Sequence, residues 1–131
     1  MTDKFAPSKT VKSILIVDDS AMNLQLLAGV LKDDYKIKVA KDGQKAVDIV
    51  NSDPSVNLIL MDVQMPNMDG FEAINLIKEN PSTEHIPVIF LTGLNDADNK
   101  SKGLKAGAID FIVKPFNSEI VKACIKSHLG V

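Results

Sequence analysis

The sequence predicts an α/β fold in which a parallel sheet carries helices on both faces. Short apolar runs alternate with amphipathic segments five times along the chain, which is the pattern of repeated strand–helix units. Three of the runs, at residues 13–17, 58–61 and 87–91, are mainly apolar throughout, as in strands that are buried on both faces. Each of these runs ends at a polar residue, so the pattern predicts a buried sheet with polar loops at the strand ends.

Length and composition indicate one globular domain. The chain has 131 residues, 45% of them hydrophobic, and a formal net charge of −2. Residues 1–12 are polar and predict a flexible tail, with the domain extending over residues 13–131. All 15 cationic side chains are lysines, and without the guanidinium fork of arginine we expect no direct nucleic-acid binding. No apolar run approaches the roughly 20 residues that span a bilayer, and no signal peptide is evident, so we expect a cytoplasmic protein without membrane contact.

The first half of the chain predicts two strand–helix units. A strand at 13–17 precedes a helix in which leucines recur at helical spacing. The next strand, at 36–40, alternates polar and apolar residues, which is typical of a half-buried edge strand. A turn at 42–43 then leads into the second helix. The predicted inward residues of these two helices are Leu24, Leu27, Leu31, Ala46, Val47 and Val50.

The third and fourth units follow the same pattern. The strand at 58–61 leads to a helix that Asp69 caps, and Glu72 stands three residues later, as in a capping box. The strand at 87–91 leads to a helix from about 96 to 106 that has few apolar residues. Its apolar stripe is thin and comprises Ala97 and Leu104, whereas the third helix presents Phe71, Ile74 and Ile77 inward.

The fifth unit comprises a short strand at 110–113 and a helix that Asn117 caps, and Gly107 before it is a predicted left-handed end of the fourth helix. We interpret the single cysteine as a small buried hydrophobic residue. His85 and His128 are far apart in sequence and lack metal-binding neighbours, so we interpret both as ordinary polar positions. The predicted inward residues of the last helix are Val121, Cys124 and Ile125.

Polar residues stand where the predicted strands end, and the carboxyl ends of parallel strands meet at one edge of a sheet. The residues are Asp18 and Asp19 after the first strand, Asp62 after the third, Thr92 after the fourth and Lys114 after the fifth. Three carboxylates close together repel one another unless a cation lies among them. Oxygen ligands without histidine or cysteine favour Mg²⁺.

This set of residues suits the transfer of a phosphoryl group. Lys114 and Thr92 could neutralise the oxygens of the transferring group, while the carboxylate of Asp62 acts as the nucleophile. The alternative interpretation is a surface cluster of acids beside a solvated lysine.

Four motifs carry a resemblance to a known family: residues 14–19 (ILIVDD), 60–70 (LMDVQMPNMDG), 87–92 (PVIFLT) and 106–116 (AGAIDFIVKPF). In this order they resemble the receiver domain of two-component response regulators, of the chemotaxis-regulator type, over about residues 13–129. The resemblance implies a flavodoxin-like α/β fold, with a doubly wound five-stranded parallel sheet in the order 2-1-3-4-5 flanked by five helices.

The resemblance also implies roles for individual residues. Asp62 would accept the phosphoryl group, and Asp62 and Asp19 would bind Mg²⁺ directly. Asp18 would bind the ion through water, and Gln64 would bind it through its backbone carbonyl.

The remaining family positions concern the phosphoryl group and its effect. Thr92 and Lys114 would hold the phosphoryl oxygens and complete a catalytic set with Asp62. Thr92 and Phe111 would form the switch, in which the aromatic ring turns inward as Thr92 moves toward the phosphoryl group. The peptide bond before Pro115 would be cis.

The implied function is a phosphoacceptor module of a phosphorelay. It would take a phosphoryl group from a phosphohistidine of a sensor histidine kinase or of a phosphotransfer protein. The surface around the fourth helix, fifth strand and fifth helix would then change, and a downstream effector domain or protein would read it. Such a module catalyses its own aspartyl phosphorylation and dephosphorylation rather than acting as an enzyme on a separate substrate. A phosphorylation-dependent homodimer stays open, as do the kinase and the output.

Two other classes share parts of this pattern. A flavodoxin-like electron carrier needs a loop that cradles the FMN phosphate, whereas residues 18–20 (DDS) would repel phosphate in the absence of a metal. A haloacid-dehalogenase-like phosphatase needs a second aspartate two residues after the nucleophile, where this chain has Gln64. The glycine-rich pattern of a P-loop enzyme is absent from the sequence.

Overall fold

A five-stranded parallel sheet forms the centre of the computed structural model, which describes residues 11–93 and 97–130. Its strands are β1 (Ser13–Val17), β2 (Lys36–Ala40), β3 (Leu58–Asp62), β4 (Val88–Thr92) and β5 (Asp110–Val113). They lie in the order β2-β1-β3-β4-β5, and all four neighbouring pairs are parallel. The predicted strand order is therefore confirmed. Most of the predicted N-terminal tail, residues 1–10, lies outside the described residues.

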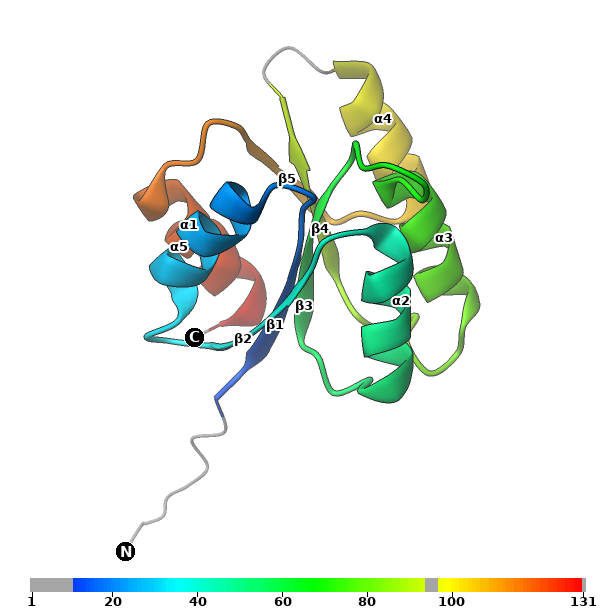
Figure 1. Ribbon diagram of the computed structural model, residues 1–131, viewed down its shortest axis with the longest axis horizontal. Coiled ribbons are helices and arrows are strands. Elements are labelled where there is room, and N and C mark those ends of the chain that lie inside the picture. The colour runs from blue at the N-terminus through cyan, green and yellow to red at the C-terminus, as the bar shows by residue number, and fades with distance from the viewer. Residues whose placement is uncertain (1–10, 94–96, 131) are drawn as a thin grey trace, which may run out of the picture.

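Five helices within the described residues cover both faces of the sheet (Figure 1). They are α1 (Ala21–Leu31), α2 (Gly43–Ser52), α3 (Gly70–Glu79), α4 (Ala97–Ala106) and α5 (Ser118–Leu129). Helices α1 and α5 lie on one face, and α2, α3 and α4 lie on the other (Figure 1). The start predicted for the fourth helix, at residue 96, is outside the described residues. None of the described helices combines the length and apolar character needed to cross a membrane.

The alternation of side chains along each strand divides the core into two halves. Leu15 and Val17 of β1 join one cluster with residues of α2 and α3, whereas Ile14 and Ile16 join the other with α1 and α5. Strand β3 is buried at all five positions, as its apolar run predicts for a central strand. At the edge, β2 is largely exposed or half-buried, and Val39 is 48% exposed.

The helix ends follow the local chemistry that the sequence predicts. The carboxylate of Asp69 accepts a bond from the Glu72 N–H (2.9 Å), and the Glu72 carboxylate accepts one from the Asp69 N–H (3.3 Å), which completes the capping box. Asn117 caps α5 with its side-chain oxygen. Gly107 has a positive φ of 116°, and its N–H donates to the carbonyl of Gly103 (3.1 Å), which ends α4.

Helix α4 contacts the core through a different residue from those in its predicted stripe. Ala97 and Leu104 are both exposed, and Gly103 is the residue of this helix that is buried. A Cβ atom at Gly103 would lie 2.7 Å from Cδ2 of Phe90 and 3.1 Å from Cζ of Phe111. The missing side chain thus lets the helix backbone approach two aromatic rings closely. A hydrophobicity pattern does not identify such a contact, because glycine contributes no side chain to it.

Glycine at position 70 is required where α3 begins. A Cβ atom there would lie 2.5 Å from the carbonyl oxygen of Asp62 and 2.9 Å from Cε1 of Phe90, neither of which can move without disturbing the central sheet. We therefore expect Gly70→Ala to lower the free energy of unfolding by about 1–3 kcal/mol. Denaturant unfolding measures this change.

The matched control is Gly29→Ala in α1, where no atom lies within 4 Å of the added methyl group. This variant should be about 0.5–1 kcal/mol more stable than the wild type, because alanine favours the helical backbone. Equal effects of the two substitutions would show that the packing around Gly70 is not tight.

Candidate functional site

The carboxyl ends of the strands bring the predicted site residues to one edge of the sheet. Asp18 follows β1, and its N–H donates to the carbonyl of Ala40 at the end of β2 (3.1 Å). Asp62 and Thr92 are the last residues of β3 and β4. Lys114 follows β5, and its backbone N–H donates to the carbonyl of Thr92 (2.8 Å). Backbone pairing therefore fixes where each of these side chains begins.

Three carboxylates meet at this edge. Oxygens of Asp18, Asp19 and Asp62 lie within 4.8 Å of one another. Asp18 and Asp62 are buried, with 0% and 5% of their surface exposed, whereas Asp19 is exposed. The Lys114 ammonium lies 3.1 Å from Oδ1 of Asp62 and 3.7 Å from Oδ2 of Asp18. One ammonium beside three carboxylates leaves the cluster negative, which favours the binding of a cation.

The environment of Asp62 disfavours its charged form. Burial raises the pKa of this carboxyl group above its ordinary value, and the neighbouring Asp18 carboxylate raises it further. Lys114 and the N–H of Gln64, which is 3.4 Å from Oδ1, act in the opposite direction. A cation beside Asp62 would add to these opposing effects and favour the carboxylate.

Two residues that the sequence analysis did not identify hold Asp18 in place. The N–H of Ser20 donates to Oδ1 of Asp18 (2.9 Å), and the side-chain amide of Asn23 donates to Oδ2 (3.1 Å). The Ser20 hydroxyl also caps α1 by accepting a bond from the Asn23 N–H (3.3 Å). In the sequence, these contacts could have been found from Ser20, because a serine directly before a helical pattern indicates an N-cap. Such a residue can also orient an acid two positions before it, here Asp18.

A pocket of about 180 Å³ lies beside Asp62. Asp62, Thr92 and Lys114, the predicted catalytic set, all line this cavity, and Gln64 lines it too. Thr92 is buried, and the peptide bond between Lys114 and Pro115 is cis, as the family resemblance implies.

Phe111 is not among the residues that line this pocket. Its half-buried ring packs instead near Phe90, with 6.3 Å between the ring centroids, and against Gly103 of α4. The structure thus places the predicted switch aromatic against α4 rather than in the pocket of Asp62.

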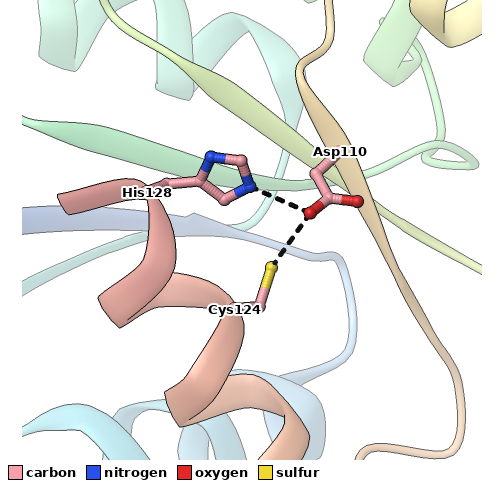
Figure 2. A group of neighbouring side chains, drawn as sticks. All are labelled: Asp110, Cys124 and His128. Carbon is pink, nitrogen blue, oxygen red and sulfur yellow. Dashed lines mark hydrogen bonds and ion pairs between the residues drawn. The ribbon is translucent and has the colours of Figure 1, made fainter. Parts of the chain in front are cut away.

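A second group of side chains lies between β5 and α5 (Figure 2). Nε2 of His128 is 2.9 Å and Sγ of Cys124 is 3.5 Å from the same oxygen, Oδ2 of Asp110. The expectation that His128 has no metal-binding neighbours is therefore wrong, because the fold brings together residues that are 18 positions apart. Cys124 packs at the edge of the core. Burial is the main cause that raises the pKa of its thiol to about 12, and the nearby Asp110 carboxylate raises this pKa further. His85 is exposed.

The sequence matches a family model described as the response regulator receiver domain over residues 14–126. A probable cyclic di-GMP phosphodiesterase of Vibrio cholerae is 44% identical over 117 residues, which are 89% of this chain and 26% of that protein. Response regulator PleD of Caulobacter vibrioides is 38% identical over 115 residues, which are 87% of this chain and 25% of that protein. The chain thus spans about a quarter of the length of these two relatives.

Solved structures agree with the fold. The chemotaxis protein CheY4 of Vibrio cholerae has a TM-score of 0.86 at 30% identity, over 92% of this chain and 100% of that one. The receiver domain of the sensor histidine kinase PA1611 of Pseudomonas aeruginosa has a TM-score of 0.84 at 26% identity, over 93% of this chain and 100% of that one. That structure is described with a magnesium ion coordinated in its active site cleft. Given the family match over nearly the whole domain and the shared strand order, the chain belongs to the receiver domain family of two-component response regulators.

Proposed function

We propose that this receiver domain is the phosphoacceptor module of a phosphorelay and that Asp62 accepts the phosphoryl group. One observation carries the proposal. The buried carboxylate of Asp62 lies 3.1 Å from the Lys114 ammonium, in a pocket that Thr92 also lines and beside two further acids. This arrangement combines a nucleophile, a hydroxyl donor, an ammonium donor and oxygen ligands for a metal.

The donor is a phosphohistidine of a sensor histidine kinase or of a phosphotransfer protein. An oxygen of Asp62 attacks the phosphorus, so that an O–P bond forms while the P–N bond breaks, and the electron pair of that bond leaves with the imidazole nitrogen. Lys114 and Thr92, which line the same pocket, bind the oxygens of the transferred group. Attack by water on the acyl phosphate later breaks the O–P bond, releases inorganic phosphate and restores the carboxylate.

The donor atoms at this edge fit Mg²⁺. Asp18, Asp19 and Asp62 offer carboxylate oxygens within 4.8 Å of one another. The backbone carbonyl of Gln64, which the family resemblance implies as a ligand, would add a further oxygen. A small hard cation prefers such oxygen ligands and commonly binds one or two carboxylates together with phosphate. When bound, Mg²⁺ would neutralise the charge of the acids and of the phosphoryl oxygens. The magnesium described for the related PA1611 receiver domain supports this assignment.

The output surface comprises α4, β5 and α5. Helix α4 is held at Gly103, and its other residues are exposed or half-buried, so it is the helix that should shift most easily. Movement of Thr92 toward the phosphoryl group opens space into which the half-buried ring of Phe111 can turn further. The two positions of Thr92 and Phe111 would couple the charge on Asp62 to the shape of a surface that an effector domain or protein binds.

The acceptor assignment predicts which substitution abolishes phosphorylation. Incubated with Mg²⁺ and acetyl phosphate, the wild type should gain one phosphoryl group that hydroxylamine removes, as expected for an acyl phosphate. Asp62→Asn should stay at background, because an amide is not a nucleophile of this kind. Intact-protein mass spectrometry measures the addition.

The matched control is Asp69→Asn, at a half-buried acid in the following loop, where asparagine also serves as a helix N-cap. This variant should be phosphorylated like the wild type. Undiminished labelling of Asp62→Asn would overturn the assignment of the acceptor.

If the proposed switch operates, a bound phosphoryl mimic should change residues that do not contact it. Beryllofluoride with Mg²⁺, which mimics the phosphoryl group, should shift backbone amide resonances from Thr92 through α4 to Phe111. In Thr92→Ala the residues around Asp62 should still respond, while the shifts in α4 should fall severalfold. Two-dimensional amide spectra measure both, and Asp62→Asn should show no response. Wild-type shifts confined to the residues that line the pocket would mean that α4 is not the moving element.

A further inference from the structure

The group formed by Asp110, Cys124 and His128 contains three different kinds of metal ligand. Asp110 opens β5, and Cys124 and His128 lie four residues apart on α5, so both point from one helix face toward the strand (Figure 2). Asp110 lies at the amino end of β5, whereas Lys114 follows its carboxyl end. The group is therefore separate from the pocket of Asp62.

The distance between the sulfur and oxygen ligand atoms matches the one that a tetrahedral ion requires, and the distance between the nitrogen and oxygen atoms is shorter than required. With Zn²⁺ bond lengths of about 2.0 Å to nitrogen and oxygen and about 2.3 Å to sulfur, tetrahedral geometry places N and O about 3.3 Å apart and S and O about 3.5 Å apart. The observed separations are 2.9 Å for His128 and 3.5 Å for Cys124, each to Oδ2 of Asp110. All three ligand atoms lie within 4.8 Å of one another. We propose that Asp110, Cys124 and His128 form a binding site for one transition-metal cation of the Zn²⁺ class.

Neighbouring groups orient the side chains of the proposed ligands. The Phe111 N–H donates to Oδ1 of Asp110 (2.7 Å), which orients the carboxylate and directs Oδ2 toward the helix. Cys124 is half-buried at the edge of the core, so its position is set by packing. The side chains of His128 and Asp110 are 26% and 45% exposed, so an ion can enter from solvent and water can take a fourth position.

The ligand chemistry separates this site from the acid cluster. A thiolate and an imidazole favour Zn²⁺ and related ions, whereas the all-oxygen set at Asp18, Asp19 and Asp62 favours Mg²⁺. Binding requires the thiol to release its proton to solvent. The bound ion would join β5 to α5 by coordinate bonds at the place where hydrogen bonds join them in this structure.

Cobalt binding tests the site directly, because the chain has one cysteine. A thiolate-to-cobalt charge-transfer band in the near ultraviolet can therefore arise only from Cys124. The titration uses untagged protein, since a histidine tag binds the same ions, and excess Mg²⁺ to occupy the acid cluster. We expect the band to saturate at one equivalent of Co²⁺ and to disappear when Zn²⁺ is added.

Variants assign the ligands. Cys124→Ser should lose the band, and His128→Ala should weaken Zn²⁺ binding by at least about 100-fold, because even the loss of a residue that only supports a ligand costs 10–100-fold. His85→Ala removes the other histidine of the chain and should bind like the wild type, as should Asp62→Asn. Amide spectra of each variant verify the fold. No charge-transfer band in the wild type, unchanged affinity in His128→Ala, or loss of binding in Asp62→Asn would each overturn the proposal.

Discussion

The burial of two carboxylates beside a single ammonium is the interaction on which the rest of this structure depends. Asp18 and Asp62 are both almost fully buried, and burial of like charges destabilises a fold unless partners compensate. Lys114 contacts both acids, and the amide of Asn23 and the N–H of Ser20 bond Asp18. These partners offset part of the cost, and the remaining negative charge would favour a bound cation, as the chemistry proposed at Asp62 requires.

The elements around the acid cluster differ in how firmly the fold holds them: β3 and the start of α3 are held firmly, and α4 is held weakly. Strand β3 is buried throughout, and the N–H of Gly70 at the start of α3 donates to the carbonyl of Val63 (2.9 Å), which fixes the chain just after Asp62. Helix α4, by contrast, meets the core at Gly103 and exposes most of its length. A weakly held helix that follows the strand ending at Thr92 would suit the conformational switch proposed above.

Local signals made most of the fold predictable, because apolar runs and caps such as Asp69 act on neighbouring residues. The acid cluster was predictable too, since parallel strands place their carboxyl ends together. Other features depend on contacts that local patterns do not encode. Gly103 packs through the absence of a side chain, and a hydrophobic pattern does not register it. Asp110 and His128 are in contact only because β5 and α5 are adjacent in the fold. The two residues are 18 positions apart in the sequence, so a local sequence pattern does not reveal their contact.

The most direct test of the central claim is the stability of Asp62→Asn relative to the wild type, measured by denaturant unfolding with a chelator and with saturating Mg²⁺. In chelator the variant should be the more stable, because it removes a buried like charge while its amide oxygen can still accept from Lys114. Mg²⁺ should stabilise the wild type more than the variant, because it binds the native acid cluster. A variant that is less stable than the wild type in chelator would contradict the account, since Asp62 would then be stabilised by its neighbours rather than strained by them.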